Sequence, residues 1–175
     1  QLARASNHVN QRSGVSVRLS VSNYEALAAS ALRRGLRAGE HAIVARIDDL
    51  DALAASSIGK IEIEALEDGR EGVIFDNLVK GAVLTVFKDR ISPSDTTAIV
   101  EAFEGGIVAH TGQDLPSGQV AALVDQLPAL RGPVSALCGV DSSPAALAAA
   151  AEFVLEGLHL SKRLNKDASG NRATY

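Results

Sequence analysis

Small apolar residues recur at intervals of three and four along most of this chain, and this spacing limits the possible folds more than any other feature. The clearest examples are residues 22–38, residues 69–89 and the segment that follows Ser143. A period near 3.6 residues is the signature of an amphipathic helix. The sequence is 46% hydrophobic but only 3% aromatic, and small aliphatic side chains favour closely packed helices over a β-sandwich. The chain is therefore predicted to be mainly α.

Start and stop signals give the approximate bounds of these helices. Ser22 and Glu25 have the spacing of a capping box, and Gly39 is a plausible stop for the same helix. Ser92 and Ser143 are each followed by proline, a pair typical of a helix start. These signals predict six helices, over residues 22–38, 49–57, 69–89 and 93–104, over about ten residues from Ser117, and from Pro144 onward.

Extended structure is expected in two places at most. Ile61 and Ile63 alternate with charged residues in "KIEIEAL", which predicts a short strand, and "GIVAHTG" predicts a second. The polar end of the chain, from about residue 165, is predicted to be frayed. Ser92 and Pro93 also indicate a possible break near residue 91.

Composition and charge exclude several broad classes of protein. The net charge of −4 gives no support to generic binding of nucleic acid or of an anionic membrane. A single cysteine, Cys138, excludes an internal disulfide framework and fits a reducing cytosol, and its apolar surroundings favour a small buried thiol over a nucleophile. Neither a membrane span nor a signal peptide is predicted. Because the chain opens on Gln1 in the middle of a polar stretch, we expect it to continue a longer protein.

The usual catalytic motifs are absent from the sequence. There is no G-x-x-x-x-G-K-[ST] phosphate loop, no G-x-G-x-x-G fingerprint and no G-x-S-x-G elbow. The four histidines are far apart, and one cysteine is too few for a zinc cluster. The acidic run Glu62, Glu64, Glu67 and Asp68 is interpreted as a solvated face. No catalytic residue and no metal site is predicted in this chain.

Three basic groups remain as candidates for binding. Arg33, Arg34 and Arg37 lie on one side of the first predicted helix, near its C-terminal end, where positive charge suits the helix dipole. The second group, at the end of the last predicted helix, consists of Lys162, Arg163 and Lys166. For both groups a solvated face is the preferred interpretation, with partner binding as the alternative.

Arg18 is the third candidate, because it precedes the predicted capped start of a helix in "SGVSVR". Arginine carries a planar, permanently charged fork that forms bidentate hydrogen bonds with phosphate oxygens. The spacing alone leaves two interpretations open, a solvated charge and an arginine directed at an anion.

The stretch "SGVSVRLSVSNYEALAASALRRGLRAGE" resembles the sensor-2 segment of AAA+ ATPases of the magnesium chelatase and MoxR group. In that segment a Gly-x-Ser-x-Arg turn opens a helix rich in Ala and Leu, and Gly14, Ser16 and Arg18 match the turn. The stretches "GKIEIEALEDGRE" and "FVLEGLHLSKRLNK" resemble the same group, so the similarity spans most of the chain.

This resemblance implies an arrangement of domains and an activity for the full-length protein. Residues 1–20 would form a linker and the sensor-2 turn, 21–91 a helical lid-type bundle, and 92–175 a C-terminal helical extension. The family assembles as homo-oligomeric rings, commonly hexamers, which bind ATP and Mg²⁺ between subunits. The lid arginine, carried here by Arg18, approaches the terminal phosphate. Family members act in the cytoplasm in protein remodelling or metal insertion, often with a von Willebrand factor A-domain protein.

The sequence therefore supports two hypotheses for the function of this chain. The first is the lid and extension of such an ATPase, whose activity would require a phosphate loop that this chain lacks. On this hypothesis the chain by itself is inactive. The alternative is a non-enzymatic helical module that binds a protein partner. Binding of nucleic acid is a weaker form of the alternative, because the charge balance is acidic.

Overall fold

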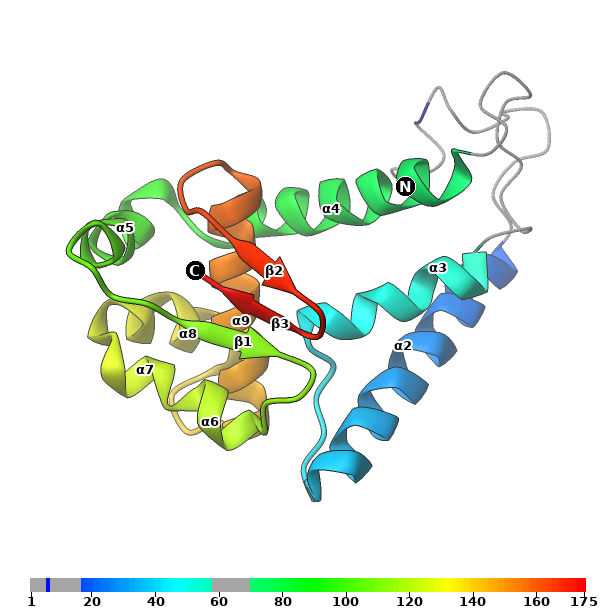
Figure 1. Ribbon diagram of the computed structural model, residues 1–175, viewed down its shortest axis with the longest axis horizontal. Coiled ribbons are helices and arrows are strands. Elements are labelled where there is room, and N and C mark those ends of the chain that lie inside the picture. The colour runs from blue at the N-terminus through cyan, green and yellow to red at the C-terminus, as the bar shows by residue number, and fades with distance from the viewer. Residues whose placement is uncertain (1–5, 7–16, 58–69) are drawn as a thin grey trace.

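The computed structural model describes Ser6 and residues 17–57 and 70–175, which form a mainly helical protein with one small antiparallel sheet (Figure 1). This confirms the predicted fold class. The described residues contain three short strands, however, where at most two were expected.

The elements follow one another along the chain with short connections. The α-helices are α2 (Val17–Ala38), α3 (Ala52–Ser57), α4 (Glu71–Arg90), α5 (Thr97–Glu104), α6 (Ser117–Ala121), α7 (Leu123–Gln126), α8 (Arg131–Cys138) and α9 (Pro144–Leu160). Three 3₁₀ turns accompany them, η1 (Ile47–Asp51), η3 (Pro93–Thr96) and η4 (Pro128–Leu130). The strands are β1 (His110–Gly112), β2 (Asp167–Ser169) and β3 (Arg172–Thr174).

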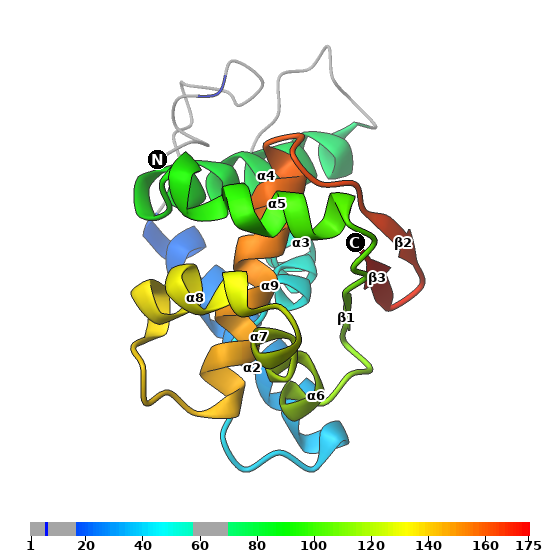
Figure 2. The same ribbon diagram turned by 90° about the vertical axis from the view of Figure 1, so that its left-hand side faces the viewer.

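Helix α9 forms the centre of the molecule, with α4, α6, α7 and α8 packed around it (Figure 2). Its sequence is apolar on almost every side, as expected for a helix that is buried all round. Val154, Leu155 and Leu158 are fully buried in one core, together with Ile99 and Leu130 from other elements. The predicted start of this helix is confirmed, since the Ser143 hydroxyl accepts a hydrogen bond from the backbone N–H of Ala146.

Helix α4 crosses α9 at very short range. A Cβ atom added at Gly157 would lie 2.1 Å from the ring of Phe87, so only glycine allows this approach. Phe87 also contacts Phe153, with 6.2 Å between the ring centroids. The predicted stripe of residues 69–89 is confirmed in part, because Ile74, Val83 and Phe87 are buried whereas Val86 is exposed.

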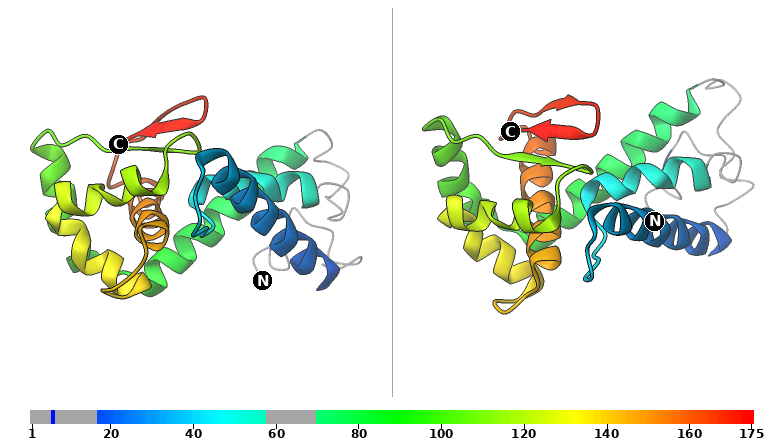
Figure 3. Two further views of the ribbon diagram at one scale, coloured as in Figure 1. Left: turned by 90° about the horizontal axis from the view of Figure 1, so that it is seen from below. Right: turned by 60° about the horizontal axis from the view of Figure 1, so that its bottom comes forward.

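Helix α2 lies beside α3, on the side of the molecule away from α5, α7 and α8 (Figure 3). It ends as predicted: Gly39 adopts a positive φ of 67°, and the N–H of Glu40 donates to the carbonyl of Gly35 across the terminus. Its predicted start is wrong. The helix already includes Val17, so Ser22 and Glu25 lie inside it and form no capping box.

The C-terminal segment is ordered in a sheet, which corrects the prediction of a frayed tail. Strand β3 lies between β1 and β2, pairing antiparallel with both, and Ala173 faces Thr111 and Ala168. Backbone hydrogen bonds between Ala109 and Tyr175 extend the ladder to the last residue. Pairing with β1 and β2 therefore orders β3, although the sequence of β3 has no strand pattern of its own.

The remaining predictions have mixed outcomes. The segments 49–57 and 93–104 are helical as expected, each with a 3₁₀ turn at its start. The predicted helix from Ser117 is divided into α6 and α7, and α8 had no counterpart in the prediction.

The strand expected in "KIEIEAL" and the acidic run Glu62–Asp68 lie outside the described residues. The division near residue 91 stays a prediction, although α4 and α9 pack together across it.

Candidate functional site

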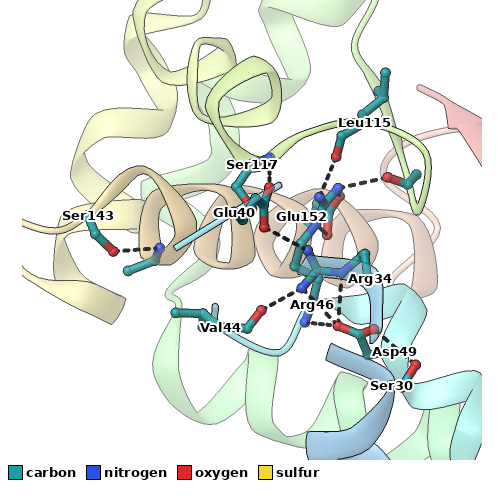
Figure 4. Close-up of polar contacts among 12 residues, drawn as sticks. Ser30, Arg34, Glu40, Val44, Arg46, Asp49, Leu115, Ser117, Ser143 and Glu152 are labelled. Carbon is teal, nitrogen blue, oxygen red and sulfur yellow. Dashed lines mark hydrogen bonds and ion pairs between the residues drawn. The ribbon is translucent and has the colours of Figure 1, made fainter. Parts of the chain in front are cut away.

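A buried network of charged groups lies where α2, η1, α6 and α9 meet (Figure 4). Its first centre is Arg34, which is only 5% exposed. Arg34 Nε and Nη2 donate to Asp49 Oδ2 over 3.2 and 3.1 Å, and Nη1 donates to Glu40 Oε2 over 3.3 Å. The carbonyl of Val44 accepts a further bond of 2.7 Å, and the Ser30 hydroxyl donates to Asp49. Arg34 therefore fastens α2 to η1, and its predicted place on a solvated face is wrong.

The second centre is the ion pair between Arg46 and Glu152, which lie 106 positions apart in the sequence. Arg46 Nε donates to Glu152 Oε2 over 2.9 Å, and Nη2 donates to Oε1, giving a bidentate pair. Both side chains are almost completely buried. The remaining Arg46 donors bond to the carbonyls of Leu115 and Gly112 over 2.7 and 2.9 Å. Burial opposes the charged form of Arg46, but the hydrogen bond and the charge of Glu152 outweigh it and raise the pKa of Arg46.

Short contacts join the two centres to each other. The Arg46 backbone N–H donates to Asp49 Oδ2, the same oxygen that receives Arg34. Glu40, which bonds Arg34, also accepts from the backbone N–H of Ser117 at the start of α6. Because each charge has an opposite charge and further hydrogen-bond partners, the network is a rigid joint between α2 and α9.

Arg18, the predicted sensor residue, lies away from this joint, at the opposite end of α2. It sits in the first turn of the helix and not in a preceding turn, and its side chain is exposed. The first turn of α2 contains no acidic residue. Backbone N–H groups at a helix start and a guanidinium on the same turn both favour an anion. Gly14 and Ser16, the other two residues of the predicted turn, lie outside the described residues.

The second basic group lies just beyond α9, which stops at Leu160, and a solvated face holds for its exposed member Lys162 but not for Arg163 and Lys166. Arg163 donates to the carbonyl of Pro93 over 3.2 Å and to the Thr96 hydroxyl. Lys166 forms an ion pair of 2.7 Å with Glu156 and lies 5.5 Å from the centroid of the Tyr175 ring. Both side chains therefore hold parts of the fold together. Cys138 is half-buried, with its thiol donating to the carbonyl of Val134.

A cavity of about 260 Å³, lined by both polar and apolar residues, lies between η1, α4, α9 and the β2–β3 hairpin. Asp48 and Asp51 line it from η1, and Glu156 and Lys166 line it from the opposite side. Burial, reinforced by the charge of Glu152, raises the pKa of Asp48 to about 6. Burial also raises the pKa of Asp51 and, together with Glu156, that of the Tyr175 phenol. Asp48 can therefore exchange a proton near neutral pH.

The part of the chain that the structure describes contains neither a membrane-spanning helix nor a cluster of metal-binding side chains. None of its helices combines the length and the apolar character needed to cross a bilayer. None of its His, Cys, Asp and Glu side chains gather in a group of three or more that could hold a metal ion.

Comparison with known proteins identifies no relative: no family model, no curated protein and no solved structure matches this chain. The joint around Arg34 and Arg46 could not have been found from the sequence, where Asp49 and Glu152 lie in ordinary helical patterns.

Proposed function

We propose that this chain is the helical lid and C-terminal extension of a AAA+ ATPase of the magnesium chelatase and MoxR group. The observation that carries the proposal is the position of Arg18, exposed on the first turn of a 22-residue helix. From this position its guanidinium can reach an anion held by another domain. An arginine placed near a transferred phosphoryl group stabilises the charge that develops there.

The exposed face of α2 supports the proposal. Val21, Tyr24, Leu32 and Leu36 are 53%, 73%, 51% and 68% exposed, and the helical period places them on one face. A row of exposed apolar side chains usually marks an interaction surface. In the proposed ATPase this surface rests on the nucleotide-binding domain, which places Arg18 toward the nucleotide between the two.

The buried joint gives α2 a means of moving the rest of the chain. Arg34 fastens α2 to η1, and Arg46, at the start of η1, is fixed to α9 through Glu152. A movement of α2 that follows the state of the nucleotide would therefore carry α9 with it. In this proposal the lid and the extension move together as one rigid unit within a cytoplasmic ring. The ring remodels a protein substrate or assists metal insertion, together with a von Willebrand factor A-domain partner.

The described residues fit one part of a nucleotide site. ATP supplies the phosphoryl group to be cleaved, and the proposal assigns Arg18 to contact its terminal phosphate. The phosphate loop and the Mg²⁺ ligands would belong to the nucleotide-binding domain. The chain by itself is accordingly proposed to be inactive.

A second candidate function is a non-enzymatic helical module that binds a protein partner. The exposed row on α2 favours it equally, because that surface needs a covering partner of some kind. The basic residues that suggested nucleic acid give it less support, since Arg34, Arg163 and Lys166 are engaged within the fold.

The test uses the full-length protein encoded by the gene. Arg18→Ala should lower the rate of ATP hydrolysis at least about tenfold, as expected for loss of a charge on a transferred phosphate, and should leave the helical circular dichroism unchanged. Arg131→Ala is the matched control, because Arg131 is exposed and far along the chain. The proposal is wrong if the gene encodes no phosphate loop upstream of Gln1. It is also wrong if Arg18→Ala hydrolyses ATP at the parent rate, and either result would favour the interaction module.

A further inference from the structure

A cavity of about 470 Å³ lies beside the C-terminal half of α2, away from Arg18, and Ser30 and Arg34 of the buried joint form part of its wall. Arg33 and Arg37 line it from the helix. Gln113 and Asp114, which follow β1, and Asn171, in the turn between β2 and β3, line it from the opposite side. Its volume is in the range of small-molecule sites, and most of its lining residues are polar or charged.

Arg33 and Arg37 are exposed, and in the described part of the chain neither forms an ion pair or a hydrogen bond. Arg34, between them in the sequence, uses its donors on Asp49, Glu40 and Val44. Like charges four positions apart on a helix repel by a few tenths of a kcal/mol. An anion between the two guanidinium groups would replace this repulsion with two charge-assisted contacts.

Neutral donors face the same cavity. The amide nitrogen of Gln113 donates to the carbonyl of Asp48 over 3.2 Å, and that of Asn171 donates to Asp114 Oδ1 over 3.5 Å. Each of these amide groups carries two N–H bonds, so one remains for a ligand. The Asp114 carboxylate, which only accepts hydrogen bonds, forms part of the wall. The cavity therefore combines donors for an anion with one acceptor.

We propose that this cavity binds a small phosphate ester. Its phosphate would receive bidentate hydrogen bonds from Arg33 and Arg37, and a hydroxyl group of its organic part would donate to Asp114. A phosphate group fits because its oxygens can accept hydrogen bonds from two guanidinium groups and two side-chain amides at the same time. Asp114 distinguishes the ester from free phosphate, because the two carry a similar charge near neutral pH but only the ester brings a hydroxyl-bearing carbon chain.

The proposal does not depend on the ATPase function. Arg18 and Arg33 are 15 residues apart on one helix, or about 22 Å along its axis. The cavity is therefore separate from any phosphate that Arg18 contacts.

Isothermal titration calorimetry of the full chain with two probes, inorganic phosphate and glycerol 3-phosphate, tests the inference. Both should bind saturably, and glycerol 3-phosphate more tightly. Arg33→Gln and Arg37→Gln should each weaken binding about tenfold, as for the loss of one bidentate contact, while Arg131→Gln should bind as the parent does. Asp114→Asn should tighten inorganic phosphate and remove the preference for the ester.

Circular dichroism checks that the variants remain folded. Because both arginines are exposed, their variants should retain the helical signal. Absence of saturable binding, or equal binding by Arg37→Gln and the control, would overturn the site. Equal affinity of the parent for the two probes would overturn the assignment of an ester. ATP hydrolysis by Arg18→Ala bears on none of these outcomes, so this inference and the proposed function can fail separately.

Discussion

Asp48 shows how one side chain can oppose the stability of the fold that contains it. Its pKa in the folded protein is about 6, above the usual value near 3.9 for an unfolded chain. Burial is the main cause of the raised pKa; the charges of Glu152 and Asp51 raise it further, whereas Lys166 and Arg46 lower it. Above pH 6 the carboxylate is charged in both states, so folding bears the full cost of its burial.

Asp48→Asn should therefore stabilise the protein at pH 7 by about 2 kcal/mol or less, since partial exposure reduces the effect. As the pH falls from 6 toward 4, folded Asp48 takes up its proton before unfolded Asp48 does. The parent then gains stability and the advantage of the variant disappears. Urea denaturation at pH 7 and pH 4.5 measures both quantities.

Asp141→Asn is a suitable control, because Asp141 is exposed at the surface. This surface substitution should change the free energy of unfolding by no more than about 0.5 kcal/mol at either pH. A constant difference between parent and Asp48→Asn across this range would show that Asp48 does not titrate as described.

At the scale of elements, the close crossing of α4 and α9 depends on the absence of a side chain at Gly157. Gly157→Ala places a Cβ atom within 2.1 Å of the Phe87 ring, which is buried and unable to move freely. The variant should lose about 1–3 kcal/mol of stability by overpacking, even though alanine is the better helix former. The midpoint of thermal or urea unfolding measures this loss.

Gly118→Ala is the matched control within another helix, since open space surrounds Gly118. It should be neutral or slightly stabilising, by about 0.5 kcal/mol. Equal effects of the two substitutions would mean that α4 and α9 do not cross at this range.

At the scale of the whole molecule, the Arg46–Glu152 pair joins segments 106 positions apart. Arg46→Met leaves the Glu152 carboxylate buried without its partner and should cost about 3–5 kcal/mol. Arg46→Met with Glu152→Leu should recover much of this loss, because no buried charge remains. Recovery should be partial, since the carbonyls of Gly112 and Leu115 also lose a donor.

A double-mutant cycle measured by urea denaturation gives the coupling between the two side chains. The exposed pair Arg131–Asp125 provides the comparison and should couple by less than about 1 kcal/mol. If the two core substitutions are simply additive, Arg46 and Glu152 do not act as a pair.

The sequence by itself determined the helical character of the protein and several helix bounds. Gly39 stops α2, Ser143 caps α9, and the apolar period of residues 69–89 corresponds to α4. These features were predictable because caps and helical periods act within a few residues. The start of α2 was mispredicted, since a capping-box spacing at Ser22 does not exclude an earlier first turn.

Only the tertiary structure decided which charges are buried and how the end of the chain is held. Arg34 and Arg37 lie three positions apart on the same helix, yet one is buried against Asp49 and the other is exposed. Strand β3 is three residues long and exists because β1 and β2 bond to both of its edges. Such contacts join residues that are distant in the sequence, and no local pattern of side chains specifies them. The physical reason is that burial and pairing are properties of the assembled fold.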